Sequence, residues 1–464
     1  MRRARHLELR ERNIKRKDEN MNSQPNILWF ITDQQSASML GCAGNPYVRT
    51  PNMDYLAAHG VRFENAYCAN PACVPSRFAL MTGMYPSTAG VTCNAYDPEP
   101  PDIVARVLEK PFGTMLRERG YETVFGGVDH AAYVDCRDLG FDYICGDERD
   151  VLARECARYI TDSDKSKPFV MVASFINPHD ICLMAINDFA HLADNESDKK
   201  ITAQMPVPLE TMRRAAMPPE NMNPKVFFEC LCPPLPENYE PAPDEPEAVA
   251  MLQRQRGFKQ LARERYTDEQ WRVHRWAYAR LTEMVDAQIG VVLDALIRSG
   301  AWDDTVIVLT SDHGDMDASH RMEHKEALYQ ECCKVPFIVK GLSGKARNIT
   351  DGRLVSGGLD CLPTILEYAG IKKPATMRGI SHKNIVEGGD PSEERTHLVV
   401  ESEFGQMAVS RTHKYVRYFH GARNEQFYDL VTNGGEMFNQ IGDARYKDSL
   451  EFLRSALDRH ANRS

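Results

Sequence analysis

Three apolar runs along the chain each end in polar residues. They are PNILWFITD (25–33), KPFVMVASFINPHD (167–180) and DDTVIVLTSDHGD (303–315). Nearly continuous runs of this length are typical of strands that are buried on both faces of a parallel sheet. Ligands bind at the carboxyl ends of such strands in open α/β sheets. The pattern therefore predicts an α/β fold with a site formed by the residues that follow these three strands.

A long amphipathic helix is predicted between residues 267 and 300. Thr267 and Gln270 fit a capping box at its start, and Gly300 fits its end. Apolar residues recur between them at steps of three and four positions, namely Tyr278, Leu281, Val285, Ile289, Val292 and Leu296. This stripe indicates core packing. Because the helix leads directly into the third apolar run, we expect a βαβ-type connection.

The rest of the chain suggests three further parts. Residues 1–22 are charged and predict a disordered tail, with Met21 as an alternative start of translation. The proline-rich residues 205–246 are either a long ordered surface excursion near the site or a simple loop. After about residue 390, short alternating stretches predict a small antiparallel sheet. We therefore expect a catalytic domain over residues 23–390 and an α+β subdomain over residues 391–464.

Composition and charge narrow the class of protein. The 464 residues are 42% hydrophobic and 26% charged, as in globular proteins, and the net charge of -10 argues against a nucleic-acid surface. The charged start contains no apolar core of a secretory signal. No apolar run approaches the ~18 residues that a membrane helix needs. We therefore expect a cytoplasmic protein that binds neither nucleic acid nor membrane.

Two groups of polar residues follow the predicted strands. Asp33, Gln34, Asp312 and His313 offer two carboxylates, an amide oxygen and an imidazole, a donor set that suits Ca²⁺, Mg²⁺ or Mn²⁺. These residues could instead have a purely structural role in turns, because Asp and Gly are common turn residues. The second group is basic and could surround a tetrahedral anion and protonate a leaving oxygen; its members are Arg77, His179, His320 and Lys325. A lone histidine, however, is usually a hydrogen-bonded structural residue.

The segment CVPSRFALMTG (73–83) resembles the signature of the type I sulfatases, which belong to the alkaline phosphatase superfamily. The resemblance implies that Cys73 is oxidised to Cα-formylglycine by a formylglycine-generating or sulfatase-maturating enzyme, and that Pro75 and Arg77 belong to its recognition sequence. The hydrated aldehyde is the nucleophile in that family: one hydroxyl attacks sulfur and the other later expels sulfate. Most of the other twelve cysteines are expected to be buried thiols.

The resemblance extends in the family's order through segments 25–35, 50–68, 174–180, 310–329 and 425–440. It implies an alkaline-phosphatase-like sandwich, with a large mixed and mostly parallel sheet flanked by helices and a small C-terminal antiparallel sheet. It also implies one divalent ion, with Ca²⁺ as the first expectation and Mn²⁺ or Mg²⁺ as alternatives. The ligands that it implies are Asp33, Gln34, residue 73, Asp312 and His313.

The same resemblance assigns roles to the basic residues. Arg77 would stabilise the hydrated aldehyde, while His179 and Lys325 would bind sulfate and assist the leaving oxygen. His130 and His320 are further catalytic candidates. The chain departs from the family at Val128, which stands where the family has a lysine in the segment GGVDH (126–130).

The pairs Asp33-Gln34 and Asp312-His313 are similar to those of the branch that includes choline-sulfatase and phosphonate monoester hydrolases. The resemblance as a whole implies a sulfuric ester hydrolase that acts on a sulfated carbohydrate or another small sulfate ester. The alternative enzyme is a phosphonate monoester or phosphodiester hydrolase with the same machinery. A third reading is a catalytically silent binding protein in which Cys73 stays unmodified.

Overall fold

The structure is a computed structural model that describes residues 24–164, 166–192, 205–342, 344 and 347–461. Its main sheet has eight strands: β1 Asn26–Asp33, β2 Val61–Tyr67, β3 Glu122–Gly127, β4 Asp142–Cys145, β5 Phe169–Pro178, β6 Thr305–Ser311, β7 Phe337–Lys340 and β8 Ile349–Ser356. Their order across the sheet is β4-β3-β5-β1-β6-β7-β2-β8. β7 runs antiparallel to both of its neighbours, and the other adjacent pairs are parallel. The predicted mixed, mostly parallel sheet is confirmed.

The three predicted strands β5, β1 and β6 lie side by side at the centre of this sheet. Leu28 of β1 is in register with Met171 of β5 and with Ile307 of β6. Alternate residues of β1 belong to two different cores: Trp29 packs on one face of the sheet and Phe30 on the other. Because both faces are covered, the run is apolar throughout rather than alternating.

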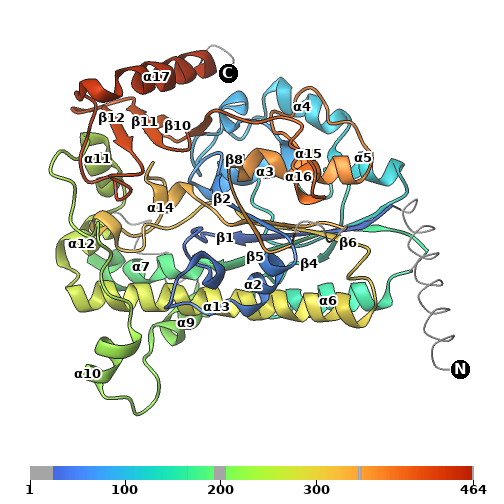
Figure 1. The fold of residues 1–464 in the computed structure, drawn as a ribbon. Coiled ribbons are helices and arrows are strands. Elements are labelled where there is room, and N and C mark those ends of the chain that lie inside the picture. Colours follow the sequence, from blue (N-terminus) through green and yellow to red (C-terminus); the bar gives the residue numbers. More distant parts are fainter. Residues whose placement is uncertain (1–23, 165, 193–204, 343, 345–346, 462–464) are drawn as a thin grey trace, which may run out of the picture.

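Helices cover both faces of the sheet (Figure 1). On one side of the view lie α3 Cys73–Thr82, α4 Asp102–Glu109, α5 Phe112–Glu118, α15 Gly357–Tyr368 and α16 Lys383–Val386. On the other side lie α2 Pro51–Ala58, α6 Leu152–Asp162, α7 Leu183–Phe189, α9 Pro206–Ala216 and the long helix α13 Asp268–Arg298. The two helical layers produce the predicted sandwich.

The helix predicted after Thr267 is α13. The Gln270 backbone N–H donates to Thr267 Oγ1 at 3.3 Å, and the Thr267 N–H donates to Gln270 Oε1 at 2.9 Å, so the capping box is present. Gly300 follows the helix with a φ of 74°, a conformation that glycine adopts without strain. The predicted apolar stripe is buried, and Val285 and Ile289 pack in the same core as Phe30. The prediction of core packing is confirmed.

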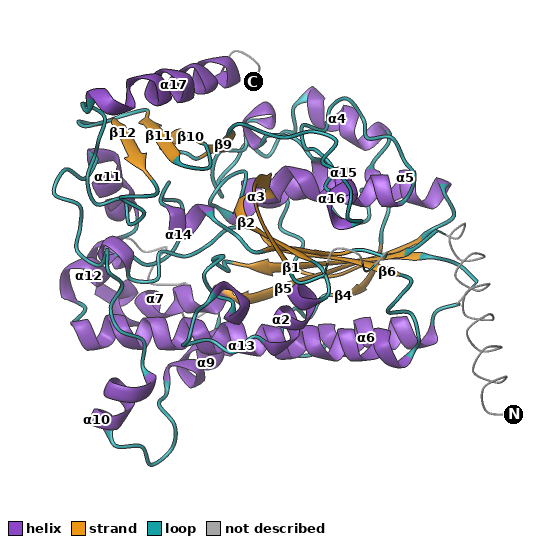
Figure 2. Cartoon of the chain, in the orientation of Figure 1, coloured by secondary structure: helices purple, strands orange, loops and turns teal. Residues whose placement is uncertain are grey.

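A second sheet of four antiparallel strands lies apart from the first (Figure 2). Its strands are β9 Leu398–Glu401, β10 Gly405–Val409, β11 His413–Tyr418 and β12 Glu425–Asp429, and α17 Lys447–Ala461 packs against it. The predicted small C-terminal antiparallel sheet is therefore confirmed. The domain boundary at residue 390 stays a prediction, and the predicted tail over residues 1–22 lies outside the described residues.

The proline-rich residues 205–246 form an ordered excursion. They contain α9, the short helix α10 Pro224–Val226 and a π-helical turn over Phe227–Leu231. α10 projects from the body of the molecule in Figure 1. The helices α11 Glu247–Gln255 and α12 Gly257–Arg265 follow, before α13 begins. No helix of the described residues is long and apolar enough to cross a membrane.

Replacing Thr267 by Ala removes the side-chain cap of α13. We expect the free energy of unfolding to fall by about 0.5–2 kcal/mol, because the Gln270 N–H loses its acceptor. Denaturant unfolding measures this change, and turnover of any substrate should be unaffected. The control is Thr211→Ala, which removes an exposed helical hydroxyl that bonds only to Val207 O and should change stability by less than about 0.5 kcal/mol. Equal losses in the two variants would contradict the role of the cap.

Candidate active site

The ends of β1 and β6 and the start of α3 meet at one point. Asp33 is the last residue of β1, Asp312 and His313 directly follow β6, and Cys73 is the first residue of α3. One ligand atom from each of these four residues lies within 4.8 Å of all the others. Three of the side chains are fully buried, and Cys73 is 7% exposed. The structure thus brings together four residues that the sequence analysis expected to share one site.

Cys73 is held between negative and positive groups. Its Sγ lies 3.3 Å from His313 Nε2, 3.7 Å from Asp33 Oδ1 and 2.7 Å from Lys325 Nζ. Burial and the Asp33 carboxylate raise the pKa of the thiol to about 12, although Lys325 acts in the opposite direction. Since the thiolate is the nucleophilic form of cysteine, an unmodified Cys73 would be a poor nucleophile at neutral pH.

Arg77 joins the two carboxylates. Its Nη2 donates to Asp33 Oδ2 and its Nε to Asp312 Oδ2, each at 3.0 Å, while Nη1 donates to Ser174 Oγ at 2.8 Å and to Val128 O at 3.2 Å. The side chain is 1% exposed. Two of its N–H groups donate to the carboxylates, so Arg77 holds them in place. The contact of Arg77 with the hydrated aldehyde stays a prediction.

The two carboxylates titrate differently. Burial alone would raise the pKa of Asp33, but the neighbouring His179 imidazole and the charges of Arg77 and Lys325 hold the pKa below its usual range. Burial and the charge of Asp33 raise the pKa of Asp312 to about 7. A cation bound between two such carboxylates favours the ionised form of both.

His313 is oriented by the backbone. Its Nδ1 lies 2.9 Å from Gly314 O, so Nδ1 carries the proton and Nε2 has a free lone pair. This Nε2 points toward Cys73 Sγ, and it lies 3.7 Å from Asp312 Oδ1. Burial, followed by the charge of Lys325, lowers the pKa of His313 to about 3, so the imidazole is neutral. A neutral imidazole with this tautomer is suited to bind a metal.

Gln34 is fixed by a residue that the sequence predictions did not include. Its Nε2 donates to Asp315 Oδ2 at 2.7 Å, which directs Oε1 toward Lys325 Nζ at 3.0 Å. The φ of Gln34 is 67°, and its N–H donates to Asp312 Oδ1 at 3.0 Å. Asp315 is the last residue of the run SDHGD (311–315). Its position two residues after His313 is the sequence feature that could have indicated a role in the site.

Asp33, Cys73, Asp312 and His313 form a potential metal site. Gln34, whose amide oxygen accepts a hydrogen bond from Lys325 Nζ at 3.0 Å, stays a predicted ligand. Carboxylate and amide oxygens with one imidazole are donors for a hard divalent cation. The group fits such an ion because two carboxylates are buried within reach of one another and His313 has the tautomer of a ligand.

Lys325 and His179 border this group. Burial would lower the pKa of Lys325, but the neighbouring Cys73 and Asp33 raise it above its usual value, so the ammonium stays charged. His179 follows β5 and is partly buried; burial and the charge of Lys325 lower its pKa to about 3. Its ring nitrogens lie 3.7 and 3.8 Å from Cys182 Sγ, a neighbour that the sequence predictions did not include.

The structure does not bring His320 and His130 into this group. His320 is buried, its ring stacks on Tyr329 with centroids 4.1 Å apart, and its Nε2 lies 3.5 Å from Asn238 Nδ2. His130 is exposed in the loop after β3. Val128, which replaces the family lysine, is buried and contributes its carbonyl to Arg77. The catalytic roles predicted for the two histidines therefore stay predictions without support from this geometry.

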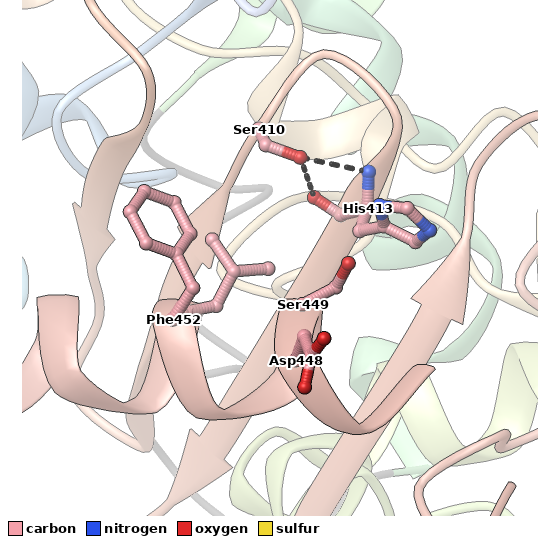
Figure 3. Close-up of a pocket in the computed structure, with 6 residues that line it drawn as sticks. Ser410, His413, Asp448, Ser449 and Phe452 are labelled. Carbon is pink, nitrogen blue, oxygen red and sulfur yellow. Dashed lines mark hydrogen bonds between the residues drawn. The ribbon is translucent and has the colours of Figure 1, made fainter. Parts of the chain in front are cut away.

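A surface pocket lies elsewhere, between the small sheet and α17 (Figure 3). It has a volume of about 230 Å³ and is lined by Ser410, His413, Asp448, Ser449, Phe452 and Leu453. Ser410 Oγ accepts the His413 backbone N–H at 3.0 Å. None of these six residues belongs to the group around Cys73, so the pocket is separate from the candidate active site.

The fold is that of the alkaline-phosphatase-like hydrolases, and the strand ends carry a potential metal site. The Sulfatase family model matches residues 25–371, and a model described as N-sulphoglucosamine sulphohydrolase, C-terminal, matches residues 318–463. The chain therefore belongs to the sulfatase family, as the motif around Cys73 indicated. Membership of the choline-sulfatase branch stays a prediction.

Individual relatives match along almost the whole chain. The Delta 4,5-hexuronate-2-O-sulfatase of Bacteroides thetaiotaomicron is 29% identical, with 95% of this chain and 89% of the relative covered. The arylsulfatase of Clostridium perfringens is 26% identical, with 94% of each covered. A solved structure of a 2-O GAG sulfatase is 28% identical, has a TM-score of 0.76, and covers 95% of this chain and 92% of its own.

Removing the bound metal should inactivate the enzyme, and Asp312→Asn should have a similar effect. The variant removes one anionic ligand while Arg77 can still donate to the amide oxygen. We expect turnover to fall by at least about 100-fold, as when one electrostatic partner of a transition state is lost. Metal content and turnover are measured together, with the exposed Asp138→Asn as the control. Full activity after exhaustive chelation would show that the group is structural.

Replacing Lys325 by Ala should lower kcat by roughly two to four orders of magnitude on a sugar sulfate, as expected for a lost acid or electrostatic donor. The loss should be smaller on 4-nitrophenyl sulfate, whose leaving group needs no protonation. The exposed Lys110→Ala variant is the control. Equal losses on both substrates would indicate ground-state binding of sulfate, and no loss on either would contradict a catalytic role.

Proposed function

We propose that the protein hydrolyses the sulfate ester of a carbohydrate through a formylglycine made from Cys73. The observation that carries this proposal is the position of Cys73, which borders the potential metal site and lies 2.7 Å from the Lys325 ammonium. Two other features support it: the raised pKa of the thiol argues against direct use of sulfur, and the chain belongs to the sulfatase family. In the mature protein, aldehyde-derived oxygens replace the Sγ atom described here.

Each residue of the site has its own role in the proposed reaction. Asp33, Asp312, His313 and Gln34 would hold a divalent ion, which supplies Lewis-acid polarisation when bound. Lys325 would neutralise charge on the sulfate and donate a proton toward the leaving oxygen. His179, neutral and adjacent to the same space, would accept or donate a hydrogen bond at the sulfate group.

A second hydroxyl completes the cycle. One hydroxyl of the hydrated aldehyde releases its proton to solvent and forms a bond to sulfur, the S–O bond to the sugar breaks, and the sugar oxygen takes up a proton from Lys325. The second hydroxyl would then give its proton back to Lys325, the aldehyde C=O forms again, and the C–O bond to sulfate breaks. Water rehydrates the aldehyde. A thiol or a serine hydroxyl has no second hydroxyl and cannot release sulfate in this way.

The substrate class is proposed from the relatives. Two curated relatives from Bacteroides thetaiotaomicron are a Delta 4,5-hexuronate-2-O-sulfatase and an N-acetylglucosamine-6-O-sulfatase, and both names specify sulfated sugars. We propose a sulfated saccharide as substrate, with a 2-O-sulfated hexuronate as the first choice, because that relative has the higher identity of the two. For the metal we propose Ca²⁺ first, with Mn²⁺ and Mg²⁺ as the alternatives.

A maturation enzyme is part of the same proposal. Because Cys73 becomes functional only after oxidation, a formylglycine-generating or sulfatase-maturating enzyme must act on the chain. Cys73 and Arg77 are buried in the folded protein. A maturation enzyme that has to reach residues 73–77 would therefore act before folding is complete.

A phosphonate monoester hydrolase is the competing function. Its support is the Asp33-Gln34 and Asp312-His313 pairs together with the fold of the Agrobacterium radiobacter enzyme, which has a TM-score of 0.68 at 20% identity. That likeness shows the fold alone. Higher identity to the sulfatases favours sulfate ester hydrolysis.

Turnover of three substrates tests the proposal. A 2-O-sulfated unsaturated uronide, 4-nitrophenyl sulfate and a phenyl phosphonate monoester are compared in protein matured together with the modifying enzyme. We expect kcat/KM to be highest for the sugar sulfate, and Cys73→Ala to abolish turnover of all three while the thermal midpoint stays close to the parent. Preference for the phosphonate would support the competing function. Activity of Cys73→Ala within tenfold of the parent would contradict the formylglycine mechanism.

A further inference from the structure

The segment that carries Lys325 has an unusual backbone. Twelve described non-glycine residues have a positive φ, and six of them lie between positions 317 and 326. They are Asp317, Ala318, His320, Arg321, His324 and Glu326. Such conformations are unfavourable for residues with a side chain and persist only when surrounding contacts fix them. The placement of Lys325 therefore depends on what holds this segment.

Contacts from residues 238–275 hold the first part of the segment. Arg275 Nε donates to Asp317 Oδ2 at 3.1 Å, the His320 N–H donates to Asn238 O at 2.7 Å, and Arg263 Nη2 donates to His320 O at 3.3 Å. All three partners come from the proline-rich excursion and from the helices α12 and α13 that follow it. The excursion thus supports the catalytic segment from outside the main sheet.

The end of the segment is held at the residue next to Lys325. The Glu326 N–H donates to Pro71 O at 2.8 Å, which ties the segment to the loop just before Cys73. On its side chain, Glu326 Oε2 accepts Lys259 Nζ at 2.6 Å. The Lys259 side chain is 4% exposed and the Glu326 side chain 20%. Although burial alone would raise the pKa of Glu326, the Lys259 ammonium holds it below its usual value.

We infer that Lys259 is a positioning residue for Lys325: through its ion pair with Glu326 it fixes the backbone from which the Lys325 ammonium reaches residue 73. The bond to Pro71 holds the Glu326 backbone and the ion pair holds its side chain, so the residue next to Lys325 is anchored at both points. The inference rests on the proposed function, because it concerns protonation of the leaving sugar oxygen.

The ion pair is well suited to this role. A buried lysine that loses its carboxylate partner leaves an uncompensated charge, so the pair resists opening. Small errors in the position of a proton donor have large effects on rate, since a displacement of about 1 Å can reduce it by about 100-fold. A purely structural pair would change stability but would leave the selectivity between leaving groups unchanged. This difference separates the two roles.

The test is the ratio of kcat on a sugar sulfate to kcat on 4-nitrophenyl sulfate in the Lys259→Met variant. We expect kcat on the sugar sulfate to fall by about 10- to 100-fold, with KM little changed, and kcat on the aryl sulfate to fall by less than about threefold, because a nitrophenolate leaves without a proton. Lys259→Arg, which keeps the charge, should restore part of the ratio. An unchanged ratio would overturn the inference.

Arg395→Met is the matched control. Arg395 Nη2 donates to Asp360 Oδ1 at 2.6 Å, the Asp360 side chain is fully buried, and neither residue belongs to the group around Cys73. Its loss should lower the thermal midpoint at least as much as Lys259→Met does, with no change in the substrate ratio. A change in the ratio as large as in Lys259→Met would show that the effect is general destabilisation and would overturn the inference.

Glu326→Gln provides a second variant if Lys259→Met does not fold. It keeps the size of the side chain and the Pro71 contact while removing the charge, and the same shift in ratio is expected. A parent enzyme that is fully matured but inactive on both sulfates would refute the proposed function itself. An active parent with unchanged ratios in both variants would refute the role of Lys259 alone.

Discussion

The buried contact of Arg77 with Asp33 and Asp312 is the constraint on which the site depends. Two carboxylates at the ends of adjacent strands repel each other, and burial makes that repulsion stronger. A single guanidinium that donates to both at 3.0 Å offsets the repulsion and fixes the spacing of the strand ends. The two side chains can then present oxygens on the side that faces Cys73. Arg77 of the signature segment thus holds the two carboxylates that are predicted metal ligands.

Burial and charge set the protonation states around residue 73. The thiol is held protonated, Lys325 is held charged, and His179 and His313 are held neutral. A charged donor next to neutral imidazoles and a carboxylate pair suits the cleavage of an anionic ester, in which negative charge grows on the departing oxygen. The unmodified thiol does not suit that reaction, and this is why the modification of Cys73 is central to the proposed function.

Sequence patterns predicted the parts of the molecule that follow local rules. The apolar runs identified β1, β5 and β6, and the capping box and stripe identified α13, because strand and helix periodicity depend on nearby residues. The polar residues that directly follow β1 and β6 predicted the potential metal site, because the carboxyl ends of adjacent parallel strands lie at the same edge of a sheet. Asp315 and Lys259 were not predicted, since their contacts join residues 281 and 67 positions apart. His320 was included among the basic residues near Lys325, but in the structure its ring stacks on Tyr329, a contact that no sequence pattern indicates.

The central claim is that residue 73 acts as a formylglycine, and mass spectrometry of the peptide that contains it tests the claim most directly. Samples are prepared with and without a maturation enzyme, and the fraction of peptide carrying an aldehyde in place of the thiol is compared with the rate of sulfate release. The account predicts that the rate is proportional to the aldehyde fraction and is lost when that fraction is zero. Sulfate release at the same rate from protein whose Cys73 is entirely unmodified would contradict it.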